Sequence, residues 1–258
     1  MTIEGVLPAQ DASYQETEQY YERHNNVFPL SRLVTEGRCC FMPTLKSILT
    51  RIRGELQEKE KVREEAQKNM RLATSLSKQA ILRIHRKRFK ESERLIAEAG
   101  EIISKLWETS RRFPAIVYTG MFSAALQEYS EANIFFKLVQ ESKFLSPVQI
   151  NVVSADYVLG LADVIGECRR LVLDELRGGN LKKAENCLHT MDEIYVQLMA
   201  MDESYMLVNG LRRKCDVARK IIEITRGDIT QEIRRSELEQ QMRRLEEQIK
   251  LKRAPAKN

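Results

Sequence analysis

Apolar residues recur every three or four positions from Leu45 to Ala80, with charged residues between them. This spacing aligns apolar side chains on one face of a helix, so it predicts one long amphipathic helix. The chain has only 11 Gly and 6 Pro, too little turn punctuation for an all-β sandwich or barrel. The same spacing predicts a second helix that ends near Arg111. It also predicts helices over residues 115–142, 155–176 and 181–201, and a last helix over residues 203–249 with a break near Gly227. We therefore predict an all-α fold.

Three regions of the chain differ in composition. Residues 1–43 hold three of the six prolines and lack sustained periodicity, so we predict an irregular N-terminal extension. Residues 44–227 carry the helical periodicity and are expected to form one helical domain. Residues 228–258 are charged and predict a helical tail, exposed or packed against a partner, because four apolar residues follow heptad-like spacing. These four are Leu238, Met242, Leu245 and Ile249.

The sequence gives no signal for a membrane or for secretion. The longest uncharged stretches, such as 113–127, are shorter than the roughly 20 apolar residues that span a bilayer. The N-terminus lacks a basic region followed by an apolar one. Five cysteines without metal-finger spacing favour reduced thiols, so we expect a cytoplasmic protein without a membrane span. A net charge of +5 permits contact with nucleic acid without requiring it.

Two windows without Lys or Arg stand out in a chain that contains 42 of them. They cover residues 113–136 and 144–168. The windows contain two acidic pairs at helical spacing, Glu128 with Glu131 and Asp163 with Glu167. Side chains three or four positions apart face the same way on a helix, so each pair directs two carboxylates toward one place. The pairs therefore predict convergent acids without nearby cations in the sequence.

A carboxylate on an apolar helix face must be balanced by a proton, a cation or a metal ion. If the two helices pack together, the four acids form the all-oxygen ligand set that Mg²⁺, or alternatively Mn²⁺, prefers. Such an ion can activate water and hold a phosphate oxygen, as phosphodiester cleavage requires. Gly160 and Gly166 on the second helix indicate close approach by a neighbouring helix or a ligand. The alternative is that each acidic pair is only a solvated helix face.

A basic segment is the other charge feature, with five Lys or Arg within eight residues. It could neutralise several phosphates and is a candidate RNA-binding surface. The alternative is a solvated basic face that pairs with Glu91, Glu93 and other acids. The candidate RNA-binding residues are Arg83, His85, Arg86, Lys87, Arg88 and Lys90.

The two acidic segments resemble motifs of the translin family, and specifically of its catalytic branch, translin-associated factor X. ALQEYSEA (residues 125–132) is similar to the LQEYVEA motif of that branch, and ADYVLGLADVIGECRRL (155–171) is similar to its VDYLLGVADLTGELMR motif. The resemblance implies a translin-like bundle of about seven helices, assembled into a hollow octamer that binds RNA inside. It further implies a Mg²⁺-dependent endoribonuclease acting on single-stranded RNA, with Glu128, Glu131 and Asp163 as active-site acids and Glu167 as a further ligand.

The short link between the third and fourth expected helices resembles a prokaryotic, archaeal member of this branch, for which a homo-octamer is expected. Single-stranded RNA is the expected substrate, with short duplexes and transfer-RNA-derived RNA as alternatives. Two competing functions stay open at this stage. One is a non-catalytic shell that binds RNA or single-stranded DNA, as translin does. The other is a helical scaffold whose tail recruits a partner.

Overall fold

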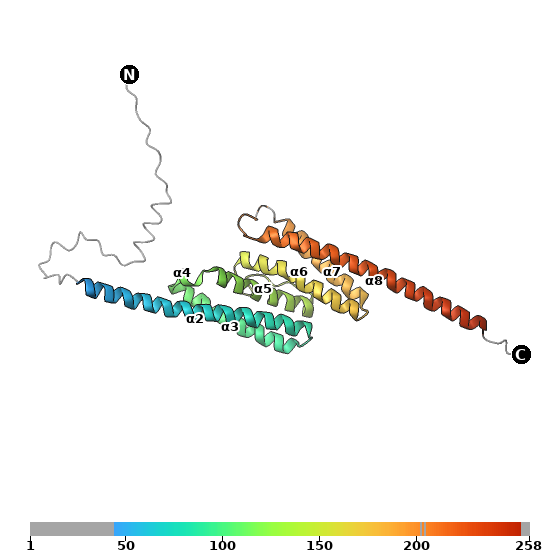
Figure 1. Cartoon of the computed structure of the whole chain (residues 1–258), viewed down its shortest axis with the longest axis horizontal. Helices are drawn as coiled ribbons and strands as arrows, with labels where there is room; N and C mark the ends of the chain where they lie inside the picture. Colours follow the sequence, from blue (N-terminus) through green and yellow to red (C-terminus); the bar gives the residue numbers. More distant parts are fainter. Residues whose placement is uncertain (1–43, 202, 204, 254–258) are drawn as a thin grey trace, which may run out of the picture. The chain divides into compact units, whose positions relative to one another are not determined.

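The computed structural model describes residues 44–201, 203 and 205–253, and their side chains as far as residue 250. In this part of the chain it contains seven helices and no strand, so the all-α prediction is confirmed. The predicted N-terminal extension lies outside the described residues. The helices are α2 (Leu45–His85), α3 (Phe89–Arg112), α4 (Pro114–Val117), α5 (Gly120–Glu141), α6 (Ser154–Arg177), α7 (Leu181–Met199) and α8 (Leu211–Arg253), shown in Figure 1.

The chain divides into two units, residues 1–52 and 53–258. Only residues 44–52 of the first unit are described, and they include the first turns of α2. The buried hydrophobic residues of the described chain begin at Ala66, so the core belongs to the second unit.

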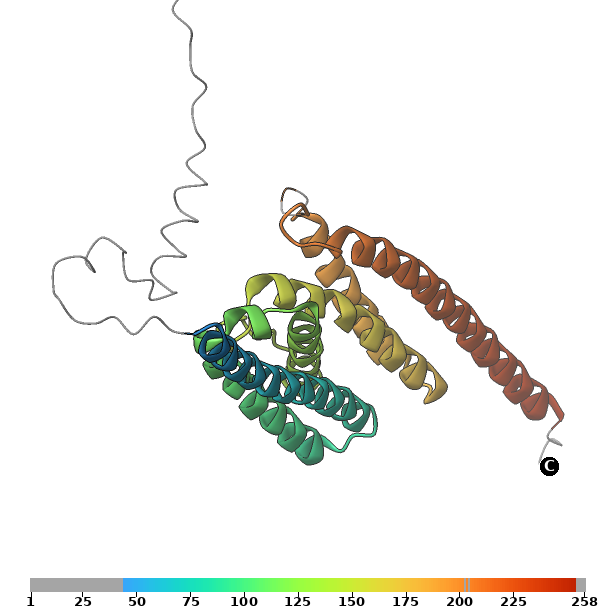
Figure 2. The same cartoon turned by 60° about the vertical axis from the view of Figure 1, so that its left-hand side comes forward.

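Within this second unit, α2 and α3 form a helical hairpin, visible from both directions in Figures 1 and 2. The turn between them contains Lys87, whose φ of 58° is left-handed and reverses the chain. Ser92 Oγ then donates a hydrogen bond to the Ala80 carbonyl at 3.0 Å, which ties α3 to α2. The buried positions of α2 follow the predicted spacing of three and four, from Ala66 to Ile84.

The prediction of a single helix over residues 115–142 is wrong, because the structure has two helices there, α4 and α5. Pro114 occupies the first turn of α4, where its missing N–H has no helical partner to lose. Tyr118 and Thr119 then leave the helical region, with ψ angles of 77° and 164°. Helix α5 starts after this break and packs against α6.

Helix α6 packs against α5, α7 and α8, which makes it the centre of this part of the bundle. Its contact with α5 is close at Gly160, where an added Cβ atom would lie 2.6 Å from the Gln127 carbonyl oxygen and 2.7 Å from Ser130 Cβ. The predicted close approach is therefore confirmed at Gly160. At Gly166 no neighbouring helix approaches, because no protein atom lies within 4 Å of an added Cβ there, and the alternative of a ligand stays a prediction.

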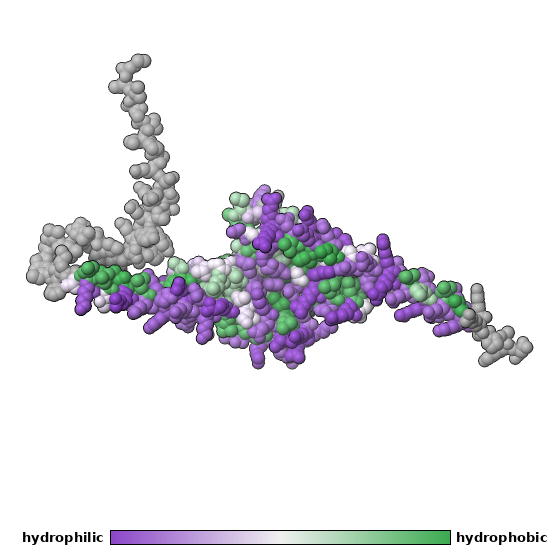
Figure 3. Space-filling view, viewed as in Figure 1, coloured by the Kyte–Doolittle hydropathy of each residue, from purple (hydrophilic) through white to green (hydrophobic). Residues whose placement is uncertain are grey.

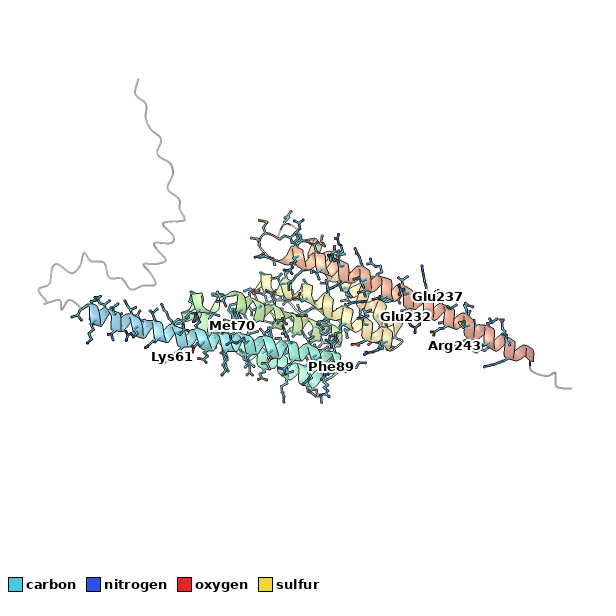
Figure 4. All side chains as sticks on the ribbon, viewed as in Figure 1. Lys61, Met70, Phe89, Glu232, Glu237 and Arg243 are labelled. Atoms are coloured by element: carbon cyan, nitrogen blue, oxygen red, sulfur yellow. The ribbon has the colours of Figure 1, made fainter. Side chains whose placement is uncertain are left out.

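The last helix also differs from its prediction. It begins at Leu211, after Gly210 with φ of 89°, and runs through Gly227 without a break. Its first half is anchored in the core by residues as far as Ile229. Residues 237–250, which include the heptad-like positions, are exposed on the segment that bears Glu237 and Arg243 in Figure 4.

The face of the molecule shown in Figure 3 is largely hydrophilic. No helix of the described chain is long and apolar enough to cross a membrane.

Candidate functional site

The four predicted acids lie on two helices that pack together, Glu128 and Glu131 on α5 and Asp163 and Glu167 on α6. Glu131 is buried, with 9% of its surface exposed. Burial, followed in order of importance by the charges of Asp163, Glu128 and Glu167, raises the pKa of Glu131 from 4.5 to about 8. The four carboxylates therefore share one electrostatic environment, which we call the acidic cluster.

Two members of the acidic cluster have basic partners on α2. Lys78 Nζ lies 3.1 Å from Glu128 Oε1, and His85 Nε2 lies 2.5 Å from Glu167 Oε2. Lys78 and His85 lie far from the acids in sequence, and α2 brings them to α5 and α6. The acids lack nearby cations along the sequence, as noted above, and basic partners reach two of them through helix packing.

A third basic partner comes from α8. The Lys214 ammonium contacts the Asp163 carboxylate and also donates a hydrogen bond to the Leu159 carbonyl oxygen at 3.3 Å. Its charge lowers the pKa of Glu131, against the larger effects that raise it. No sequence signal separates Lys78 and Lys214 from the other Lys and Arg residues, because their role depends on helix packing.

His85 differs from the rest of the basic segment. Its side chain is only 3% exposed and its ring lies 5.1 Å from the ring of Phe135. Nε2 contacts Glu167, while Nδ1 has no hydrogen-bond partner. The expectation that His85 contacts RNA together with its basic neighbours does not fit this burial. His85 belongs to the acidic cluster instead.

The other residues of the basic segment lie at the end of α2, in the turn and at the start of α3. Arg83 is bound to Glu91 at 2.9 Å, and Arg88 lies 3.7 Å from the same side chain, as the alternative of a solvated, paired face predicts. Arg86, Lys87 and Lys90 are exposed and make no ion pair with any residue that the structure describes. These three cations are therefore available to phosphates.

A polar contact that the sequence did not reveal connects the start of α6 to α5. Asp156 is 6% exposed and accepts hydrogen bonds from Ser123 Oγ and, at 3.3 Å, from Gln127 Nε2. Gln127 also donates to Ser123 Oγ at 3.0 Å. This network satisfies a buried carboxylate and fixes the register in which the acidic pairs meet.

The acidic cluster fits Mg²⁺ in the chemistry of its donors, because four carboxylates are hard oxygen ligands and repel one another when charged. The arrangement of the acids in this conformation, however, is not that of a metal site. Within the described ranges, no three His, Cys, Asp or Glu side chains are grouped so that they could hold a metal ion. Glu128, Glu167 and Asp163 instead contact Lys78, His85 and Lys214, respectively.

Comparison with known proteins gives the family. The model of the Translin family matches residues 61–224, which include both acidic pairs and the basic segment. The chain belongs to the translin family. An uncharacterised protein of Methanocaldococcus jannaschii is 35% identical to this translin-family chain over 200 residues, 77% of this chain and 88% of the relative.

Solved structures agree with this assignment. AfC3PO is 34% identical to this member of the translin family with a TM-score of 0.65, covering 71% of this chain and 96% of the other. AfC3PO in complex with duplex RNA is 34% identical with a TM-score of 0.64, covering 71% and 95%. Apo-NeC3PO, 24% identical with a TM-score of 0.66, covers 74% and 100% and shares the fold.

Proposed function

We propose that this translin-family chain is a metal-dependent endoribonuclease that cleaves single-stranded RNA inside an oligomeric shell of its own copies. The observation that carries the proposal is the acidic cluster, in which burial and three neighbouring charges raise the pKa of Glu131 to about 8. Four acids held together on rigid helices are costly for stability and suit a function that needs them charged. The complex of AfC3PO with duplex RNA supports RNA as the class of ligand.

In this proposal Glu128, Glu131, Asp163 and Glu167 hold Mg²⁺, with Mn²⁺ as the alternative. The ion supplies Lewis-acid chemistry, lowering the pKa of water and polarising a phosphate oxygen. With these four acids as ligands, the proposal places the chain on the catalytic branch of the family, that of translin-associated factor X rather than that of translin.

The chain's own basic groups have defined tasks in this proposal. Lys214 contacts one oxygen of the Asp163 carboxylate, which leaves the other oxygen for an ion and places the ammonium where it could contact the phosphate. His85 holds Glu167 in place through Nε2. Arg86 and Lys87 bind phosphates along the strand that enters the site.

A second candidate function, a non-catalytic shell that binds RNA or single-stranded DNA, is favoured by the ion pairs. Glu128, Asp163 and Glu167 each have a basic partner within the chain. A network of this kind is compatible with a purely structural role, since these three partly buried acids each already have a basic partner.

The deciding experiment incubates the full-length chain with labelled single-stranded RNA, with Mg²⁺ or with excess chelator, beside an Asp163→Asn variant. Cleavage that requires Mg²⁺ and is lost in the variant supports the nuclease. Binding without cleavage under all conditions supports the shell. Duplex RNA and transfer RNA as further substrates define the preferred RNA, and light scattering of the same sample tests for an octamer.

A further inference from the structure

A pocket of about 650 Å³ lies among the end of α2, the start of α3, the end of α5, and helices α6 and α7. None of the four acids lines it, but His85 does, so it adjoins the acidic cluster through one side chain. Its volume falls within the range of about 300–1,000 Å³ that is typical of ligand sites. Phe89, labelled at the start of α3 in Figure 4, and Phe144 contribute flat apolar surface to its wall.

Two polar atoms at this pocket have no hydrogen-bond partner. The side chains of the described residues contain three such buried atoms, and two of them, His85 Nδ1 and Glu175 Oε2, belong to residues that line the pocket. The His85 side chain is only 3% exposed. Buried polar atoms in native proteins are nearly always paired, and an orphaned one loses its hydration without compensation. A ligand that reaches these atoms by a small movement of their side chains would supply the missing bonds.

The chemistry of Glu175 defines what the ligand must bring. His85 Nε2 already contacts a Glu167 oxygen at 2.5 Å, and its Nδ1 is the ring atom without a partner. The Glu175 carboxylate can only accept hydrogen bonds when charged. The ligand must therefore present N–H donors and a flat apolar face, and Lys87 and Lys183 at the pocket suit an anionic group on it.

We propose that this pocket binds a guanine nucleotide of the RNA. Guanine presents an N–H and an amino group side by side on one edge, which matches a single carboxylate such as that of Glu175. Its ring fits against the Phe89 and Phe144 walls, and its phosphate meets Lys87 and Lys183. This inference rests on the proposed function, because the guanine is taken to belong to the RNA substrate. It predicts that the RNA position beside the acidic cluster prefers guanine.

The test is isothermal titration calorimetry of the full-length chain with GMP, AMP, CMP and UMP. GMP should bind at least about tenfold more tightly than the other three nucleotides, since loss of one charge-assisted pair of hydrogen bonds has that effect or more. Glu175→Gln should weaken GMP binding at least about tenfold, while Glu101→Gln, on α3 outside the pocket, should leave it unchanged. Equal binding of the four nucleotides, no binding, or unchanged binding by Glu175→Gln would overturn the proposal.

A second variant protects the test against misfolding of Glu175→Gln. Asn186 is exposed at the pocket edge, so Asn186→Trp should block the pocket without disturbing the core, and circular dichroism should match the parent chain. GMP binding that survives this substitution contradicts the proposed location. Because calorimetry needs no cleavage, GMP binding without nuclease activity would refute the proposed catalysis alone, and RNA cleavage without GMP binding would refute the pocket alone.

Discussion

His85 Nε2 lies 2.5 Å from Glu167 Oε2, although the two residues are 82 positions apart. The contact joins the C-terminal end of α2 to the middle of α6. It takes His85 out of the basic segment to which its sequence position assigns it and makes it part of the acidic cluster. Helix α2 thus brings Lys78 and His85 to the acids, while Arg86 and Lys87, in the turn that follows it, stay exposed.

The acidic cluster should be required for cleavage but not for RNA binding. Asp163→Asn removes the charge and keeps the size of the side chain, so we expect cleavage to fall about 100-fold or more. RNA affinity should stay within a few fold, as measured by fluorescence anisotropy in chelator. Asp174→Asn, on the same helix and paired with Arg177, is the matched control. Full activity in Asp163→Asn would refute the proposed site.

Glu131 should make stability fall as pH rises. Its pKa is raised from 4.5 to about 8 in the folded chain, so between these values the folded state binds a proton that the unfolded state has lost. The contribution of Glu131 is therefore complete below pH 4.5 and is lost as pH rises toward about 8, with a slope of at most about 1.4 kcal/mol per pH unit.

Urea denaturation in chelator measures this effect. The difference in the free energy of unfolding between Glu131→Gln and the parent chain should increase in favour of the variant from about pH 5 to about pH 8. A constant difference over this range would show that the folded chain does not hold a proton on Glu131.

The exposed basic residues should control the salt dependence of RNA binding. Replacing Arg86, Lys87 and Lys90 by Ala should weaken binding to all sequences and make the plot of log affinity against log salt shallower by about 0.7 per lost contact with a single strand. Replacing Lys105, Arg111 and Arg112, at the other end of α3, removes the same charge and should leave the slope unchanged. His85→Gln should also leave the slope unchanged, because His85 is buried.

Two glycines of α6 should respond to Ala in opposite directions. Gly160→Ala places a methyl group 2.6 Å from the Gln127 carbonyl oxygen, so it should lower the free energy of unfolding by about 1–3 kcal/mol. Gly166→Ala meets nothing within 4 Å and should raise it by about 0.5–1 kcal/mol through helix propensity. Chemical denaturation of both variants tests the pair. Equal stability of the two would contradict the close packing of α5 on α6.

The end of α8 should be dispensable, but only beyond its buried part. Removing residues 237–258 deletes exposed positions of α8 and should leave the free energy of unfolding unchanged. The mass measured by light scattering should also stay unchanged, at about eight subunits. Removing residues 228–258 also deletes Ile229, which is 3% exposed, and the Asp228 partner of Arg169 at 2.5 Å. The longer deletion should lower the free energy of unfolding by at least about 2 kcal/mol, because the loss of one buried Ile side chain alone costs about 2–5 kcal/mol. Dissociation of the shorter deletion would make the heptad-like positions the assembly element.

Local spacing was sufficient to predict most of the helices. The apolar period identified the long α2, and the helix predicted over residues 155–176 differs by one residue at each end from α6. The divided helix at Tyr118 and the unbroken α8 at Gly227 escaped prediction, because tertiary packing outweighs the weak intrinsic preference of single residues. The acidic pairs were also evident, since a shared helix face follows directly from a separation of three or four positions.

What only the tertiary structure decided is which groups meet these acids. The sequence determined that Glu128 lies beside Glu131 and Asp163 beside Glu167, because a helix fixes the relative positions of near neighbours. It could not determine that Lys78, His85 and Lys214 reach them from α2 and α8. Those contacts depend on the order and angle of helix packing, and the helical period of an amphipathic segment fixes its buried face but not the helix that covers it.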